Sequence, residues 1–235
     1  MANYLMFAAS SAIGQATSRI LESKGHRVFK TARTDKTIKP DMILEDAADF
    51  NQVDGVFQHA INHLGTVDGV VNCSGSLLLK PAHLTSRENY DDVIKSSLTT
   101  SFAVVRVAGK NLKGGSVVLI SSAVHAIGLP NHEAIAAAKA GIVGLALSAA
   151  ATYAESNIRF NVVCPGLTDT PLTERITTNQ AALAYSLAMH PLKRIGQPED
   201  IARAIVFLLD PENNWITGQV LSVDGGLSRL KTKLS

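Results

Sequence analysis

The chain has 235 residues, of which 46% are hydrophobic and 18% are charged. This balance suits one soluble globular domain spanning residues 1–235, and no Pro/Gly/Ser-rich or low-complexity tract indicates a linker. A net charge of +2 without a basic-rich face excludes a large nucleic-acid footprint. The apolar runs are shorter than a membrane span, and residues 1–10 lack the basic start of a signal peptide, so we expect a cytoplasmic protein.

The two cysteines, Cys73 and Cys164, lie far apart in the sequence and show neither CxxC nor Cys/His ligand spacing. This pattern predicts buried free thiols in a reducing cytoplasm and no metal site.

Short apolar runs alternate with longer helical patterns along the whole chain. The expected strands are residues 4–8, 28–32, 42–44, 67–71, 116–120, 158–163 and 219–223. The expected helices are residues 15–24, 51–64, 91–112, 132–154 and 199–209. Strands that alternate with helices of ten or more residues predict βαβ units, and therefore an α/β fold with a doubly wound parallel sheet of about seven strands and helices on both faces.

Residues 117–139 place candidate reactive groups at the end of an expected buried strand. Ser122 follows the strand, and Lys139 lies on the next expected helix. Ile135 precedes Lys139 by one helical turn and faces the same side. Ligands of open α/β folds bind outside the carboxyl ends of the strands, so we expect the active site here.

The turn between the first strand and the first helix is where a dinucleotide would bind. Such a site needs backbone N–H groups and a helix N-terminus close to the pyrophosphate, and glycines usually allow that approach. Residues 7–14, Phe-Ala-Ala-Ser-Ser-Ala-Ile-Gly, contain a single glycine, Gly14. Taken alone, this loop fits a structural turn as well as a cofactor site.

The pattern as a whole resembles the short-chain dehydrogenase/reductase family over essentially the entire chain, which implies a single-domain Rossmann-like fold. The family's loop reads TGxxxGIG, and four residues here match it: Ser10, Ser11, Ile13 and Gly14. Ala8 and Ala12 stand in place of its first two glycines. Alanine disfavours a positive φ by ~1–2 kcal/mol, so we expect the loop to lie further from the phosphates or to form a different turn.

Further residues match the family's cofactor site. The resemblance implies that Asp46 binds the adenine amine and that Asn72-Cys73-Ser74-Gly75, in place of NNAG, passes the adenine ribose. It also implies that Thr168 and Thr170 in Pro165-Gly166-Leu167-Thr168-Asp169-Thr170 hold the nicotinamide carboxamide. Ala32 replaces the carboxylate that would bind the ribose of NAD, and Arg33 follows it, which favours NADP(H) over NAD(H).

The family reduces carbonyls with a serine, a tyrosine, a lysine that depresses the tyrosine's pKa, and an asparagine. Ser122 and Lys139 match, and the resemblance gives Lys139 a second role on the nicotinamide ribose. The tyrosine position holds Ile135 and the asparagine position holds Ser97. Loss of a general acid typically costs 10²–10⁴-fold in rate, so we expect the usual chemistry to be impaired unless another residue substitutes.

Three side chains are alternatives for the missing acid: Tyr185 in the expected substrate lid, residues 172–191, and His125 and His132 beside the serine loop. The other histidines are interpreted as surface residues: His26, His59, His63, His83 and His190.

The resemblance implies an NAD(P)-dependent oxidoreductase that interconverts a small-molecule carbonyl and a secondary alcohol with non-standard acid–base residues. One alternative is a catalytically impaired member that acts as a cofactor-binding, regulatory or structural subunit. Another is an isomerisation or elimination that uses Lys139 or a histidine as base. Helices 91–112 and 132–154 are apolar on more than one face and form the subunit interface in the family, so we expect a homodimer or homotetramer and no membrane partner.

Overall fold

Seven parallel strands form one sheet in the computed structural model, which describes residues 1–33 and 39–231. The order across the sheet is β3-β2-β1-β4-β5-β6-β7, and every neighbouring pair is parallel. The strands are β1 Asn3–Phe7, β2 Arg27–Ala32, β3 Met42–Ile43, β4 Gly69–Asn72, β5 Gly115–Ile120, β6 Ile158–Pro165 and β7 Val220–Val223. The predicted doubly wound, Rossmann-like sheet is therefore confirmed.

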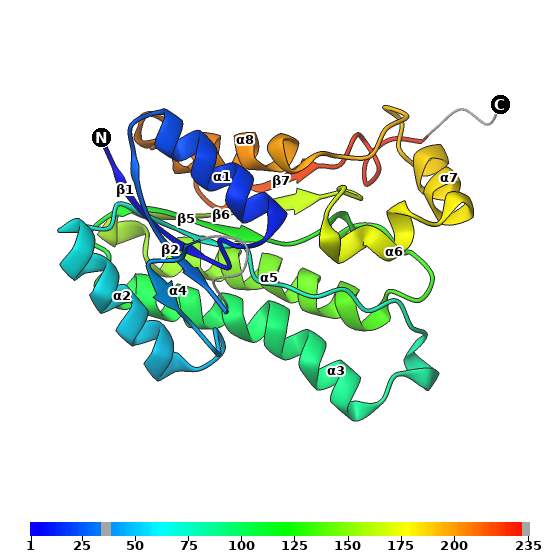
Figure 1. Ribbon diagram of the computed structural model, residues 1–235, viewed down its shortest axis with the longest axis horizontal. Coiled ribbons are helices and arrows are strands. Elements are labelled where there is room, and N and C mark those ends of the chain that lie inside the picture. The colour runs from blue at the N-terminus through cyan, green and yellow to red at the C-terminus, as the bar shows by residue number, and fades with distance from the viewer. Residues whose placement is uncertain (34–38, 232–235) are drawn as a thin grey trace.

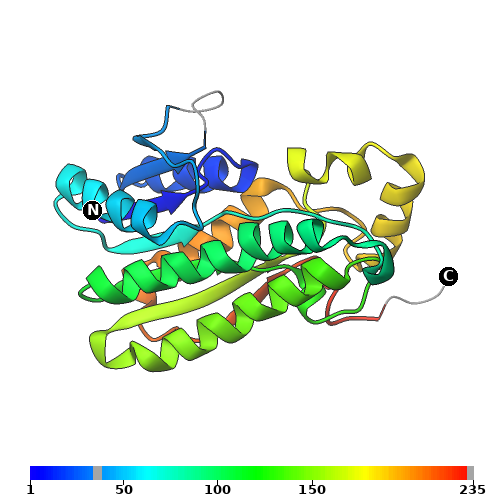
Figure 2. The ribbon, with the colours of Figure 1, turned by 90° about the horizontal axis from the view of Figure 1, so that it is seen from below.

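Helices cover both faces of the sheet. They are α1 Ala12–Ser23, α2 Phe50–Leu64, α3 Arg87–Ile94, α4 Thr100–Asn111, α5 Glu133–Thr152, α6 Glu174–Thr177, α7 Gln180–Met189 and α8 Pro198–Leu209. Figure 1 shows α1 and α8 above the sheet and α2, α4 and α5 below it. Figure 2 shows α4 and α5 side by side across the lower face.

The alternation of side chains along each strand builds two cores. Leu5 and Phe7 of β1 join the cluster under α2, α4 and α5, whereas Tyr4 and Met6 join the cluster under α1 and α8. Successive residues of a strand point to opposite faces, so a strand covered on both faces must be apolar throughout. This is why the central strands read as continuous apolar runs in the sequence.

The expected helix 91–112 is interrupted. It begins at Arg87, because Ser86 caps it by accepting the N–H of Asn89, and a π-helical turn, Lys95–Thr99, separates α3 from α4. Hydroxyls around this turn bond back to the chain: Thr100 Oγ1 donates to the Ser96 carbonyl at 3.0 Å and Ser101 Oγ to that of Ser97 at 2.8 Å. Such bonds compete with the helical ladder, and π-turns are frequent at functional sites.

One histidine is placed differently from its prediction. His190, interpreted as a surface residue, is only 1% exposed. It ends α7, and its Nδ1 lies 2.7 Å from the Ser186 carbonyl. The ring packs against Gly166, and because a Cβ there would lie 2.8 Å from the His190 Nε2, the absence of a side chain at this position leaves room for the ring. The expected lid, residues 172–191, contains α6 and α7 and follows the carboxyl end of β6.

Within the described residues, α5 is long and apolar enough to cross a membrane by length and composition alone. Its inner face packs against β6 and buries Ala138, Ile142 and Ala146. Packing of this kind is that of a core helix in a sheet with helices on both faces.

Candidate active site

A groove of about 670 Å³ lies at the carboxyl ends of β1, β2, β3 and β4, where the strand order reverses. Ligands of open α/β sheets bind at such a reversal. The predicted site residues that line the groove are Ser10, Ser11, Arg33, Asp46, Ser74 and Gly75.

The loop between β1 and α1 keeps a tight turn despite its alanines. Ala8 adopts a φ of 53°, in the left-handed region that glycine would normally occupy, at a cost of ~1–2 kcal/mol for a residue with a Cβ. Gly14 is required by close packing, because a Cβ there would lie 2.8 Å from the Ala8 carbonyl oxygen. Ser11 caps α1 by accepting the N–H of Gly14, whereas Ile13 packs against the core. The N-terminus of α1 therefore adjoins the groove, as dinucleotide binding requires.

Asn72 shapes the floor of the groove. Its side-chain Nδ2 donates to Ser101 Oγ at 3.2 Å, and its side-chain Oδ1 accepts the N–H of Ser74 at 3.0 Å. These bonds tie the end of β4 to α4 and fix the backbone of residues 73–75. Asn72 itself is buried, so it acts on a ligand through the shape of this loop.

At the outer end of the groove, Asp46 forms an ion pair with Lys95. The Lys95 Nζ lies 2.8 Å from Asp46 Oδ2, while Asp46 Oδ1 accepts the N–H of Ala48 at 2.9 Å. The hydrogen bond from Lys95, followed by that from Ala48, lowers the pKa of Asp46. Lys95 was missed in the sequence, although Asp92, Lys95, Ser96 and Thr100 share the three- and four-residue spacing of one helix face.

At the inner end, the groove leads to Lys139. Gly75 lines the groove, and a Cβ built on it would lie 3.2 Å from the Lys139 Nζ. The amine donates to the Ile120 carbonyl at 3.0 Å and the residue is 7% exposed. Burial lowers the pKa of Lys139 to about 8. Ser122 lies two residues beyond Ile120, and its Oγ accepts the N–H of Val124 at 3.4 Å.

The two positions predicted to correspond to the family's tyrosine and asparagine are both buried. Ile135 is 2% exposed and packs with Val93, Ala138 and Leu78 in an apolar cluster between α3 and α5. Ser97 lies in the π-turn, and its Oγ is buried without a hydrogen-bond partner. The proton donor of the predicted reaction therefore has to be another group.

The three alternative acids have different surroundings. His125 is half-buried in the turn that Ser122 caps, and its Nδ1 lies 2.8 Å from the Ser122 carbonyl. His132 precedes α5, with its Nδ1 2.7 Å from the Pro130 carbonyl. Tyr185 is 61% exposed on α7. Only His125 is tied directly to the serine.

The segment predicted to hold the carboxamide does not line the groove. Pro165 ends β6, and Gly166 lines a separate cavity of about 410 Å³. Thr168 Oγ1 donates to the Gly166 carbonyl, and Thr170 caps a short 3₁₀ turn together with Thr173. These contacts fix the shape of the segment, and its role toward a cofactor stays a prediction.

Both cysteines lie near Lys139. Burial raises the pKa of Cys73 to about 12 and that of Cys164 to about 11. Neither forms a disulfide. Both side chains are therefore neutral thiols near physiological pH and poor nucleophiles there.

Comparison with known proteins matches residues 7–228 to a family model described as enoyl-(acyl carrier protein) reductase. The chain is 32% identical over 240 residues to the 3-oxoacyl-[acyl-carrier-protein] reductase FabG of Thermotoga maritima, covering 95% of this chain and 96% of that protein. The ligand-free aldohexose dehydrogenase of Thermoplasma acidophilum superposes with a TM-score of 0.88 and 28% identity, over 100% of this chain and 96% of that one. The structure of ElxO with NADP bound superposes with a TM-score of 0.88 and 26% identity, over 96% of this chain and 98% of that one.

Replacing Lys139 with methionine is expected to stabilise the protein at neutral pH. The lowered pKa means that folding disfavours the ammonium form, by roughly 3 kcal/mol, and methionine avoids this cost. Loss of the hydrogen bond to the Ile120 carbonyl destabilises the variant by only about 1 kcal/mol. Because the folded protein releases the Lys139 proton at a pH of about 8, earlier than the unfolded chain does, the wild type should become more stable as the pH rises above that value. The extra stability of Lys139→Met over the wild type should therefore shrink. Urea unfolding at about pH 7 and about pH 9.5 measures the difference in unfolding free energy between the variant and the wild type. A difference that is the same at both pH values would contradict the burial of the amine.

Proposed function

The chain belongs to the short-chain dehydrogenase/reductase family, and we propose that it is an NADP(H)-dependent oxidoreductase that interconverts a carbonyl and a secondary alcohol. The observation that carries this proposal is the continuity of the groove. It begins beside Arg33 and Asp46, and it reaches Gly75, which adjoins the buried amine of Lys139. A dinucleotide needs such an extended site with a reactive end.

The groove has the features that a dinucleotide requires. The close packing at Gly14 brings the loop against the start of α1, whose N–H groups favour phosphate. Arg33 lines the groove next to Ala32, where a carboxylate would exclude a 2′-phosphate. When bound, the cofactor supplies a hydride to the carbonyl carbon. We assign Ser10, Ser11, Gly14, Arg33 and Asp46 to its adenosine and phosphate side.

The remaining task of the protein is to stabilise and protonate the carbonyl oxygen. The Ser122 hydroxyl donates a hydrogen bond to that oxygen, and the Lys139 ammonium holds positive charge beside it. Ile135 has no proton to give. We infer that His125 acts as the acid, because the Ser122 carbonyl fixes its Nδ1–H and leaves Nε2 to carry the transferable proton.

The relatives indicate which substrates to assay first. The Thermotoga maritima protein is named for the reduction of 3-oxoacyl thioesters on acyl carrier protein. A 3-oxoacyl thioester is therefore the first carbonyl compound to supply. The lid residues 172–191 would lie over such a substrate, with Tyr185 contributing an exposed aromatic surface.

We further propose that the protein is a cytoplasmic homo-oligomer that joins through α4 and α5. Phe102 of α4 and Leu147 of α5 are 49% and 47% exposed in the single chain, and a second copy would cover them. Light scattering at micromolar concentration should give at least twice the mass of one chain. Phe102→Glu together with Leu147→Glu should reduce that mass to one chain, and a monomeric wild type would contradict the interface.

Replacing Arg33 with alanine should weaken NADPH binding about tenfold or more and leave NADH binding nearly unchanged, because the guanidinium is proposed to bind only the 2′-phosphate. Fluorescence titrations of the wild type and of Arg33→Ala with each cofactor measure the dissociation constants for NADPH and NADH. Wild-type protein that binds neither NADPH nor NADH up to millimolar concentration would overturn the proposed function. Tight binding without turnover of any carbonyl would instead favour a cofactor-binding subunit.

His125→Gln should lower kcat for 3-oxoacyl thioester reduction by about 10²–10⁴-fold, because glutamine offers hydrogen bonds but no acidic proton. His132→Gln is the matched control and should retain wild-type kinetics. Equal activities of the two variants would rule out His125 as the acid.

A further inference from the structure

A second groove lies at the amino ends of the strands, whereas the cofactor groove lies at their carboxyl ends. Its volume is about 910 Å³, and three of the residues that line it, Tyr4, Ser116 and Arg159, are near the starts of β1, β5 and β6. We call it the amino-end groove. Among its described lining residues, none is assigned above to the cofactor or the substrate. Its chemistry is therefore separate from that of the proposed active site.

Arg159 places a buried positive charge at this groove. The residue is 8% exposed. Its Nη1 donates to the Ile216 carbonyl at 2.9 Å and its Nη2 to the Asp210 carbonyl at 3.3 Å. A guanidinium stays protonated in proteins and has further N–H donors to offer. Within residues 1–33 and 39–231, no carboxylate forms an ion pair with it.

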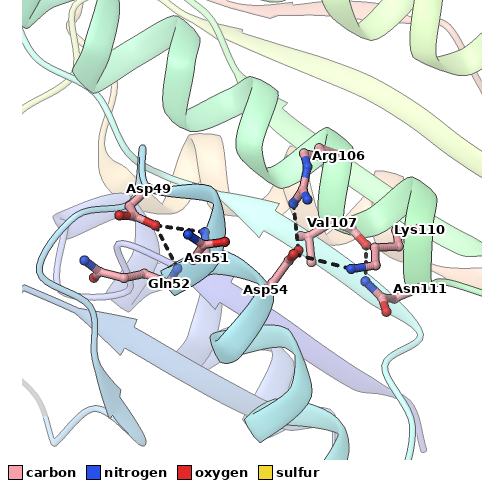
Figure 3. Close-up of polar contacts among 8 residues, drawn as sticks. All are labelled: Asp49, Asn51, Gln52, Asp54, Arg106, Val107, Lys110 and Asn111. Atoms are coloured by element: carbon pink, nitrogen blue, oxygen red, sulfur yellow. Dashed lines mark hydrogen bonds and ion pairs between the residues drawn. The ribbon is translucent and has the colours of Figure 1, made fainter.

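The contacts of Arg106 show how an arginine is paired elsewhere in this chain. Its Nη1 lies 2.8 Å from Asp54 Oδ1, and Lys110 shares that carboxylate at 3.4 Å (Figure 3). The Arg106 side chain is 36% exposed, so water also solvates it. Arg159 has less access to water and no such partner in the described chain. Because a buried charge is costly without a counter-ion, the amino-end groove favours an anion.

Tyr4 adds a hydroxyl that is free to bind the same anion. The residue is 1% exposed and lines the groove, and its hydroxyl forms no hydrogen bond with the described residues. Burial, followed by the charges of Asp210 and Asp68, raises the pKa of Tyr4 to about 12. The hydroxyl therefore keeps its proton and can donate it to a hydrogen bond. Buried hydroxyls usually have a partner, so this one indicates a ligand with an acceptor atom.

Trp215 is held at the edge of the amino-end groove with its indole in solvent. It lines the groove and is 96% exposed. The segment that carries it is tied to β6, because the Ile216 carbonyl accepts both Arg159 Nη1 and Asn161 Nδ2 at 2.9 Å. The indole is thus displayed on a fixed segment beside the guanidinium. A large aromatic surface in this position gains free energy when a ligand covers it.

The charged side chains of the groove favour a ligand with a single negative charge. Arg159 and Lys113 line it with positive charge and Asp68 lines it with negative charge, which leaves one positive charge in excess. Asp68 is engaged with the backbone, because its Oδ2 accepts the N–H of Asn3 at 2.7 Å. A carboxylate matches this excess, whereas a phosphate dianion would add a second charge that Asp68 repels.

We propose that the amino-end groove is a binding site for an aromatic carboxylate. The carboxylate accepts hydrogen bonds from Arg159 and Tyr4, because a planar guanidinium matches the two oxygens of that group. The ring packs against the indole of Trp215. Small-molecule sites have volumes of about 300–1,000 Å³ and combine apolar surface with a few polar groups. The amino-end groove has both features, and the proposal does not depend on the chemistry of the cofactor groove.

The single tryptophan of the chain is Trp215, so its fluorescence reports on the amino-end groove. Titration of the whole protein with phenylacetate should give a saturable change in that fluorescence. Phenylacetamide lacks the negative charge and should bind about tenfold or more weakly. Cyclohexylacetate lacks the aromatic ring and should bind about threefold or more weakly.

Two variants test the polar contacts. Tyr4→Phe keeps the buried ring and should weaken phenylacetate binding about fivefold or more, because one hydrogen bond to a charged group is lost. Arg159→Lys should weaken it about tenfold, since an ammonium group cannot offer two parallel N–H donors. Arg27→Lys is the matched control and should bind as the wild type does. Arg27 also donates to two backbone carbonyls, those of His63 and Leu64, but it does not line the groove.

Calorimetric titration with phenylacetate should give the same dissociation constant with and without saturating NADPH, because the two grooves are separate. Loss of phenylacetate binding on addition of NADPH would place the ligand in the cofactor groove and overturn the proposal. The absence of a saturable change up to millimolar phenylacetate, equal binding of phenylacetamide, or wild-type affinity in Tyr4→Phe would each overturn it. Trp215 emission that shifts to shorter wavelength with protein concentration alone would show that a second copy covers the groove, and this would overturn it as well.

Discussion

The burial of Lys139 against the end of β5 is the constraint around which the site is built. Its Nζ donates to the Ile120 carbonyl, and this bond fixes the start of α5 relative to the strand that leads to Ser122. The bonds offered to it are few, so burial lowers the pKa of the amine to about 8. A residue that destabilises the fold in its charged form is typical of a functional position, because packing alone would favour an apolar side chain.

The same constraint explains the glycine on the facing side. A Cβ on Gly75 would lie 3.2 Å from the Lys139 Nζ and 4.0 Å from the Ser97 Oγ of the π-turn. Two other segments of the chain therefore converge on this glycine. Ile135, which lies one turn before Lys139, instead joins an apolar cluster with α3. Isoleucine has no proton to give, and this is why the proposal turns to His125.

The sequence predicted the elements better than the contacts between them. Apolar runs such as residues 67–71 and helical periodicity such as residues 51–64 identify strands and helices, because burial on both faces or on one stripe dictates the residue types. The π-turn at Lys95–Thr99 was not predictable in this way, since it depends on hydroxyls that compete with the helical ladder. The prediction for His190 was wrong because Gly166, which is distant in the sequence, makes room for its ring. Lys95 was missed because its partner, Asp46, lies in another segment.

The central claim is that one groove holds a dinucleotide with its adenine end at Asp46 and Lys95 and its reactive end at Lys139. A crystal structure of the protein grown with NADPH tests this most directly. The account predicts the adenine amino group at the Asp46 carboxylate, the 2′-phosphate at Arg33 and the nicotinamide ribose beside Lys139. A dinucleotide bound elsewhere, such as in the cavity lined by His190 and Asp224, or bound in the reverse direction, would contradict it.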